Sequence, residues 1–169
     1  MKYSHKNQGY TMIELVMVMV IIAILTGIIL PVFLHGGLDE GRNTLQSSVF
    51  CAKTFATTKR RQCTLTLNAN YYTTPNPSPC TFTIEDVDKT VKKLYQLPKY
   101  IRFWQYQVVG SGSESFISGA KTVYFEPHGI AHNTSGIMTP QDIIITLKDI
   151  KTGSTTSQTI IGNTCQIKR

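Results

Sequence analysis

The chain is short and carries a modest positive charge. Its 169 residues include 17 Lys or Arg and 10 Asp or Glu, which gives a formal net charge of +7 at pH 7. Beyond the first 34 residues about 130 remain, a length that favours one domain over several. Such a charge permits contact with nucleic acid or anionic lipid, but it is also ordinary for a soluble surface and indicates neither partner.

A long apolar run lies close to the N-terminus. Residues 15–34 carry no charge, and only Thr26, Gly27 and Pro31 interrupt the apolar side chains. A helix of about 20 residues is about 30 Å long, which matches the hydrocarbon core of a bilayer. The run therefore predicts a membrane helix over 10–34. Pro31 predicts a kink in it, because the proline ring removes one helical hydrogen bond.

The flanks of the run predict its orientation. Lys2 and Lys6 precede it, so the positive-inside rule keeps the N-terminus in the cytoplasm and exports everything after His35. A cleaved secretory signal would have a shorter apolar core followed by a small-residue cleavage site, and no Ala-x-Ala pattern follows this run. An uncleaved single-pass anchor remains an alternative.

Glu14 is an acidic residue at the mouth of the apolar run. A carboxylate inside a membrane helix costs about 2.5 to 3.5 kcal/mol at the centre and less near the ends, so it usually has a function. Cleavage after Gly9 would give Tyr10 a free amine four residues before Glu14. We expect the two groups to pair, most strongly between neighbouring subunits, where each would otherwise be buried without a partner. The helix dipole also favours an acidic residue in the first turn, which is a weaker, local explanation.

The sequence GYTMIEL (9–15), followed by an apolar helix, resembles the class III leader of type IV pilins and pseudopilins. The resemblance implies a leader of residues 1–9, cleaved after Gly9 by a prepilin peptidase. It further implies N-methylation of Tyr10, assembly of the helices into a filament, and a role for Glu14 as the assembly carboxylate. Tyrosine stands where that family usually has phenylalanine, and the aromatic character is kept.

A helical pattern continues beyond the apolar run. Apolar residues at helical spacing predict a helix over about 38–60 that packs on a sheet, within an exported segment 35–61. The glycines around Gly36 and at Gly41 predict one or two weak points in this helix. The residues that form the apolar stripe are Leu45, Val49, Ala52 and Ala56.

After Arg61 the apolar residues alternate, which predicts a β-rich ectodomain over 62–169. CTLTLN (63–68) and CTFTIE (80–85) read as half-buried strands, joined by a proline-rich loop. Further strands are expected at 100–109, 121–126, 142–148, 157–161 and 164–168.

One short helix is expected among these strands. Val87, Val91 and Leu94 lie at helical spacing before Pro98, which would end it. The predicted fold class is α+β, a long N-terminal helix packed on an antiparallel sheet or pair of sheets.

Four cysteines follow the apolar run, and none forms a Cys-x-x-Cys pair. In an oxidising compartment this pattern predicts two disulfides rather than buried free thiols. Of the three connectivities we favour Cys63 with Cys80, across neighbouring strands, and Cys51 with Cys165, tying the helix to the last strand.

Two stretches of the ectodomain narrow the resemblance. FATTKRRQCTLTL (55–67) places a basic cluster before the first strand, and VYFEPHGIA (123–131) runs from a strand into a Pro/Gly turn. Together they resemble the GspH/FimT-type minor pilins of type IV pili and minor pseudopilins of type II secretion systems. The resemblance implies a structural subunit that lies in the bacterial inner membrane with a periplasmic C-terminal domain and enters a pilus or pseudopilus. Its partners would be prepilin peptidase, other pilins or pseudopilins and inner-membrane lipid.

Residues suited to catalysis or metal binding are sparse. His128 and His132 lie near Glu126, but a proline and a glycine break the helix that ligands at this spacing need, so we expect no metal site and no cofactor. GSGSES (110–115) lacks the strand-turn-helix setting of a phosphate loop or nucleophile elbow and predicts a hairpin loop. We expect no enzyme.

Basic clusters give a hypothesis from another class, a DNA-binding minor pilin for DNA uptake. The interpretation we favour is that these residues complement a helix C-terminus and keep the surface soluble. The candidate DNA contacts are Lys59, Arg60, Arg61, Lys168 and Arg169, with Lys92, Lys93, Lys99 and Arg102 as further members of the basic set.

Overall fold

The computed structural model describes residues 11–69, 79–88, 90–116, 119–134, 136 and 139–168, without the side chains of 29–36 and 91. It divides into two compact units, Met1–Gly36 and Gly37–Arg169, referred to below as unit 1 and unit 2. Gly9, Tyr10, most of the proline-rich loop and Arg169 lie outside the described residues, so their predicted roles are not addressed by the fold.

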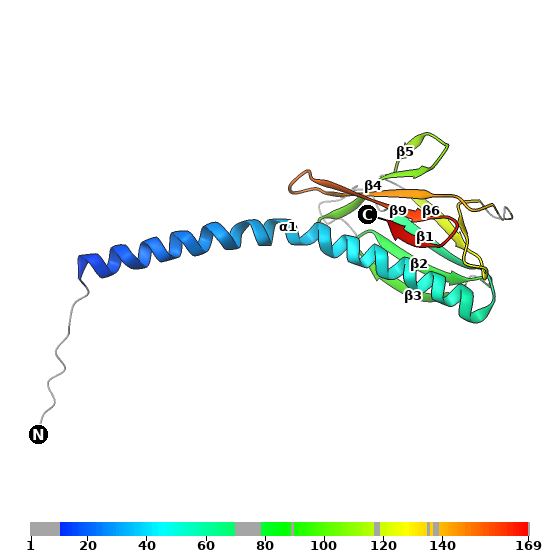
Figure 1. Ribbon diagram of the computed structural model, residues 1–169, viewed down its shortest axis with the longest axis horizontal. Coiled ribbons are helices and arrows are strands. Elements are labelled where there is room, and N and C mark those ends of the chain that lie inside the picture. Colours follow the sequence, from blue (N-terminus) through cyan, green and yellow to red (C-terminus); the bar gives the residue numbers. More distant parts are fainter. Residues whose placement is uncertain are drawn as a thin grey trace, which may run out of the picture. The chain divides into compact units, whose positions relative to one another are not determined.

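Helix α1 extends over Met12–Lys59 (Figure 1). In unit 1 its apolar side chains occupy consecutive positions and are exposed on every side, from Met12 at 89% to Ile28 at 64%. In the part of the chain that the structure describes, no helix has both the length and the hydropathy of a membrane span. The predicted span over 10–34 includes Tyr10 and the side chains of 29–34, which lie outside that description. The predicted kink at Pro31 stays a prediction.

In unit 2 the second part of α1 packs on the sheets, as its apolar stripe predicts. Leu45, Val49, Ala52 and Ala56 are all buried. The helix is continuous through the glycines at which weak points were predicted. Gly41 instead permits a close approach, since a Cβ there would lie 2.9 Å from Cγ2 of the buried Ile101.

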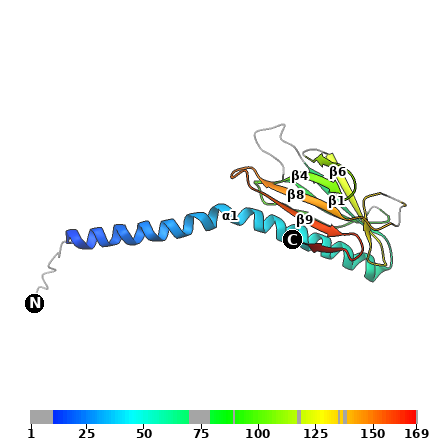
Figure 2. The ribbon, with the colours of Figure 1, turned by 45° about the horizontal axis from the view of Figure 1, so that its top comes forward.

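Unit 2 contains two five-stranded antiparallel sheets (Figure 2). Sheet A has the order β3-β2-β1-β6-β7, and sheet B has the order β10-β9-β8-β4-β5. The strands of sheet A are β1 (Cys63–Ala69), β2 (Thr81–Asp86), β3 (Val91–Gln96), β6 (Gly119–Phe125) and β7 (Ala131–His132). The strands of sheet B are β4 (Ile101–Val108), β5 (Ser113–Ser115), β8 (Ile143–Asp149), β9 (Thr155–Ile161) and β10 (Gln166–Lys168).

The α+β class and the antiparallel pairing are confirmed, but the predicted short helix is wrong. Residues 91–96 form β3, which pairs with β2 at the edge of sheet A. Leu94 is 55% exposed, so the apolar spacing does not mark a buried helix face. The pairing of backbone groups with β2 outweighs a pattern of only three apolar residues. The short strands β5 and β7 were not predicted.

Aromatic side chains join the two sheets. The rings of Phe82 on β2 and Phe103 on β4 meet edge to face with centroids 5.1 Å apart, and Phe116 lies 5.2 Å from Phe103. All three side chains are buried. Since removing such a ring from a core costs about 3 to 5 kcal/mol, this cluster is a main source of the attraction between the sheets.

The structure contains neither predicted disulfide, and all four cysteines are free. Cys63 pairs with Asp86, whereas Thr81 pairs with Asn68, so Cys80 lies at the other end of the β1–β2 ladder. Six residues of strand span about 20 Å, far beyond the Cα separation of about 7 Å that a disulfide tolerates. The register therefore excludes Cys63 with Cys80.

The second predicted pair, Cys51 with Cys165, is also absent from the structure, and its two partners have different neighbours around α1. Cys165 is close to Lys53, whereas Cys51 is close to Cys63 on β1. Residues two apart on a helix point to opposite sides, so Cys51 and Cys165 lie on different sides of α1. The Cys165 thiol instead donates a hydrogen bond to the carbonyl of Gly129 at 3.0 Å.

Candidate processing and assembly site

The N-terminus of α1 is closed by a capping box formed by Thr11 and Glu14. The backbone N–H and the hydroxyl of Thr11 both donate to Oε2 of Glu14, at 2.8 and 2.9 Å. In return the Glu14 N–H donates to the Thr11 hydroxyl oxygen at 3.4 Å. This reciprocal arrangement satisfies donors that a helix N-terminus otherwise leaves open. The sequence Thr-x-x-Glu carries the signature of this box, although only pairing with a free amine and the helix dipole had been predicted for Glu14.

The capping box leaves the Glu14 carboxylate accessible. Glu14 is exposed, and among the described residues no donor bonds to its Oε1. Thr11 is the residue directly after Tyr10, so a new amine at Tyr10 would be one residue from a group that Glu14 already binds. The carboxylate can therefore cap its own helix and still accept a bond from a cation of this subunit or a neighbour.

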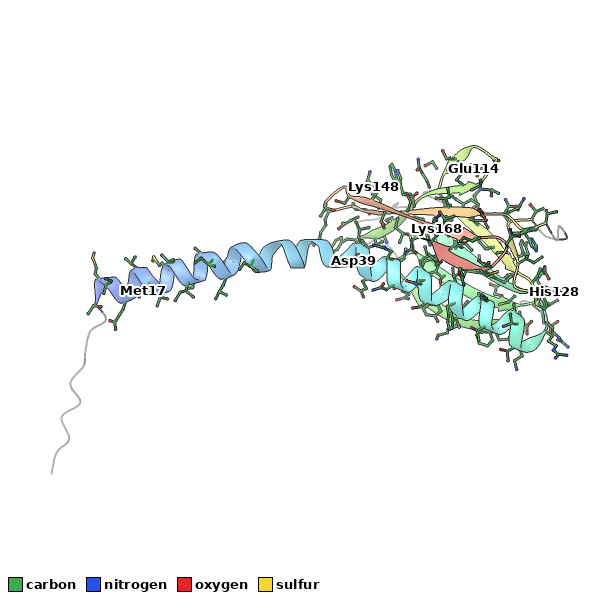
Figure 3. The ribbon with its side chains drawn as sticks, viewed as in Figure 1. Met17, Asp39, Glu114, His128, Lys148 and Lys168 are labelled. Carbon is green, nitrogen blue, oxygen red and sulfur yellow. The ribbon has the colours of Figure 1, made fainter. Side chains whose placement is uncertain are left out.

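The apolar surface on both sides of Glu14 in the sequence is large and exposed. Thirteen large apolar side chains between Met12 and Ile28 are exposed by half or more. A helix that is apolar on every side is stable when lipid or other helices surround it, and an apolar surface of this size on a soluble protein marks an interaction site. The side chains around Met17 in Figure 3 belong to this surface.

A second candidate site lies where α1 ends. A cavity of about 570 Å³ is bordered by Lys59, Arg61 and Lys92, with Asp86 as the acidic residue. Lys92 on β3 lies 3.9 Å from the Asp86 carboxylate. The fold thus brings Lys92 to the cluster at the helix end, and we refer to this cavity as the basic cleft.

The other predicted basic residues are not all suited to a DNA-binding surface. Arg102 is buried on β4, where its side chain has little access to a ligand. Lys93 lies over the ring of Tyr95 at 4.8 Å, and Lys99 lies 5.7 Å from the ring of Tyr100. Lys168 lies on β10, and Arg169 is outside the described residues. The predicted basic set therefore reduces to the basic cleft and separate lysines.

Of the predicted histidine cluster, His132 and Glu126 lie in the folded core, whereas His128 is exposed. Nε2 of His132 lies 3.0 Å from Oε1 of Glu126, its Nδ1 lies 2.8 Å from the carbonyl of Thr134, and the Gln62 amide donates to the same Glu126 oxygen at 2.5 Å. His132 and Glu126 are buried. Among the described residues no group of three or more His, Cys, Asp or Glu could hold a metal ion.

The family model of the prokaryotic N-terminal methylation motif matches residues 4–30. The chain thus carries a type IV pilin-like N-terminus. The motif supports processing by prepilin peptidase, assembly with other pilins and anchoring in a membrane. No curated protein and no solved structure matches the chain.

Proposed function

We propose that the chain is a minor pilin or pseudopilin of GspH/FimT type, a structural subunit of a type IV pilus or type II secretion system. The observation that carries the proposal is the methylation motif placed directly on an exposed apolar helix whose first turn presents Glu14. In this proposal prepilin peptidase cleaves after Gly9, Tyr10 is methylated, and segment 10–34 crosses the inner membrane once with the N-terminus in the cytoplasm. The ectodomain then lies in the periplasm.

The mechanism is assembly and not catalysis. The membrane covers the apolar surface of α1 until neighbouring helices in a filament replace the lipid. Transfer from lipid to a helix bundle leaves the apolar burial nearly unchanged, so charge pairing decides the register of the subunits. Glu14 supplies that charge, and the methylated amine of a neighbouring Tyr10 supplies its partner.

Two substitutions separate this pairing from capping. Glu14→Gln keeps an acceptor at the capping-box position, because Gln serves there as Glu does, but it removes the charge. Thr11→Ala removes the cap and keeps the charge. We expect both variants to be cleaved, Glu14→Gln to lose incorporation into filaments about tenfold or more, and Thr11→Ala to lose much less. Filament fractions probed with antibody measure the outcome, and normal incorporation of Glu14→Gln would refute the pairing.

The basic cleft favours one alternative function, DNA binding during uptake. Three cations against one carboxylate around an open cavity suit a phosphate backbone. In this alternative Lys59→Ala with Arg61→Ala weakens DNA binding of the whole chain and lowers its salt dependence, whereas Lys168→Ala changes it little. Binding that is unaffected by the double substitution would reject the cleft as the DNA site.

A further inference from the structure

An aromatic and basic patch lies on the surface of unit 2. Tyr100, Trp104 and Ile150 are exposed by 39%, 38% and 43%, although large apolar side chains are usually buried. Lys99, Lys148 and Lys151 surround them. These six residues are called the Trp104 patch below.

The fold builds this patch from β4, the segment before it, β8 and the turn after it. The β4–β8 pairing shifts between Phe103 and Gln105, so Trp104 has no partner residue on β8, and its side chain is exposed while Phe103 stays buried. The Lys148 amine on β8 lies 3.8 Å from the Trp104 ring centroid. The Ile150 N–H donates to the Tyr100 carbonyl at 3.0 Å, which ties the β8–β9 turn to the segment before β4.

The cations of the patch are not neutralised within the described chain. Lys151 lies 3.8 Å from the Tyr100 ring centroid, and among the described residues none of the three lysines forms an ion pair. The nearest carboxylate in sequence, Asp149, is buried and accepts the Lys151 backbone N–H at 2.8 Å. The patch therefore presents rings and positive charge together.

The patch lies at the end of unit 2 where α1 enters. Ile101, next to Tyr100, packs against the helix so closely that a Cβ on Gly37 would be 3.4 Å from its Cδ1. Gly37 is three residues after Leu34, so even an extended chain keeps the end of the apolar run within about 11 Å of it. Figure 3 shows Lys148 and Asp39 at this end of unit 2 and His128 at the opposite end.

We propose that the Trp104 patch binds the anionic headgroup region of the bilayer that holds the N-terminal helix, an inference that rests on the proposed membrane anchoring. Trp and Tyr prefer the membrane interface, where the ring is half apolar and half wet, and lysines near an anionic leaflet are attracted to it. Among the acidic residues at this end, the exposed Asp39 pairs with Arg42 at 3.5 Å, and Glu40 adds one further exposed charge. The contact orients the ectodomain before assembly.

A single-stranded nucleic acid is the competing ligand, because bases also stack on exposed rings beside cations. The membrane is favoured because chain connectivity keeps this end of unit 2 close to the apolar run. The basic cleft, in contrast, lies at the helix end farthest along the chain from that run.

The test uses the fluorescence of Trp104, the one tryptophan in the chain. The full chain is reconstituted into vesicles of phosphatidylcholine alone or with phosphatidylglycerol, with acyl chains brominated near the headgroup as quenchers. We expect a blue shift and quenching of Trp104 in the anionic vesicles only. Lys148→Ala with Lys151→Ala should reduce the quenching to the level of the phosphatidylcholine vesicles. Lys93→Ala, which removes another lysine that lies over a tyrosine ring, is the matched control and should leave the quenching unchanged.

Each outcome bears on one claim. If the chain floats with the vesicles while Trp104 remains unquenched in both lipids, the proposed lipid binding of the Trp104 patch is overturned and the membrane anchoring is left intact. Chain that does not float with either kind of vesicle would overturn the anchoring itself. Quenching of Trp104 by a single-stranded oligonucleotide, with none by anionic lipid, would assign the patch to nucleic acid and overturn the proposal.

Discussion

Glu14 serves its own helix before any partner is present. Its Oε2 accepts two hydrogen bonds from Thr11, while its side chain stays exposed. A carboxylate that was only a cap would stabilise the helix by about 1 kcal/mol, which is too little to justify placing it beside an apolar run of this length. In the proposed assembly, the cap holds the carboxylate where an incoming cation can reach it.

Arg60 ends α1 in a conformation that usually belongs to glycine. Its φ is 53°, and the Arg61 N–H donates to the Ala56 carbonyl at 3.3 Å, as in a Schellman motif. We predict that Arg60→Gly stabilises the protein by about 1 kcal/mol, because a side chain in this region is strained. Lys59→Gly, one residue earlier inside the helix, should destabilise it by a similar amount. Urea unfolding measures the free energy of unfolding of both variants. A destabilised Arg60→Gly variant would refute the claim that Arg60 is strained.

Burial and the charge of Asp86 raise the pKa of the Cys63 thiol to about 11, and burial raises the pKa of Cys165 to about 11. An unfolded chain releases these protons near pH 8.5, so the folded state binds more protons between the two values. The stability that these two thiols contribute should thus be fully present below about pH 8.5 and should fall as the pH rises towards 11. Urea midpoints across this range measure the loss. Cys63→Ala should make the urea midpoint depend less on pH. An unchanged pH dependence in this variant would contradict the raised pKa of Cys63.

At the scale of elements, the sequence predicted the strands that bury alternate residues. β1 shows strict alternation of buried and half-buried residues, and its predicted bounds, 63–68, differ from the structure by one residue. The exposed edge strand β3 lacks such a pattern, so period alone could not identify it. The predicted disulfide between Cys63 and Cys80 was wrong for a related reason. Both cysteines lie near strand starts, but only the register shows that antiparallel pairing separates those starts.

Gly162, in the turn after β9, packs closely against the segment before β8. A Cβ on Gly162 would lie 2.3 Å from the backbone N of Gln141, and the Gly162 carbonyl accepts the Ala131 N–H at 2.8 Å. We predict that Gly162→Ala costs about 3 kcal/mol, because backbone and not a flexible side chain must move. Gly112→Ala, in a turn where a Cβ meets nothing within 4 Å, is the control. Equal unfolding midpoints for the two variants would contradict this constraint.

At the scale of the whole molecule, the functional N-terminus was predictable and the surface of unit 2 was not. The leader motif and the apolar run are continuous in sequence, so pattern alone reveals them, and the methylation-motif match covers residues 4–30 of this stretch. The Trp104 patch combines residues from β4, β8 and two connecting segments. These segments are brought together by the β4–β8 pairing, which no local sequence pattern reveals.

The central claim is that this chain is processed as a prepilin. Intact mass and N-terminal sequencing of the protein extracted from membranes test it most directly. We predict a chain that starts at Tyr10 and carries one added methyl group, and a Gly9→Val variant that keeps its Met1 start because a bulky residue blocks the peptidase. A native chain that starts at Met1 without the methyl group would contradict the account and leave Glu14 as the cap of a plain membrane anchor.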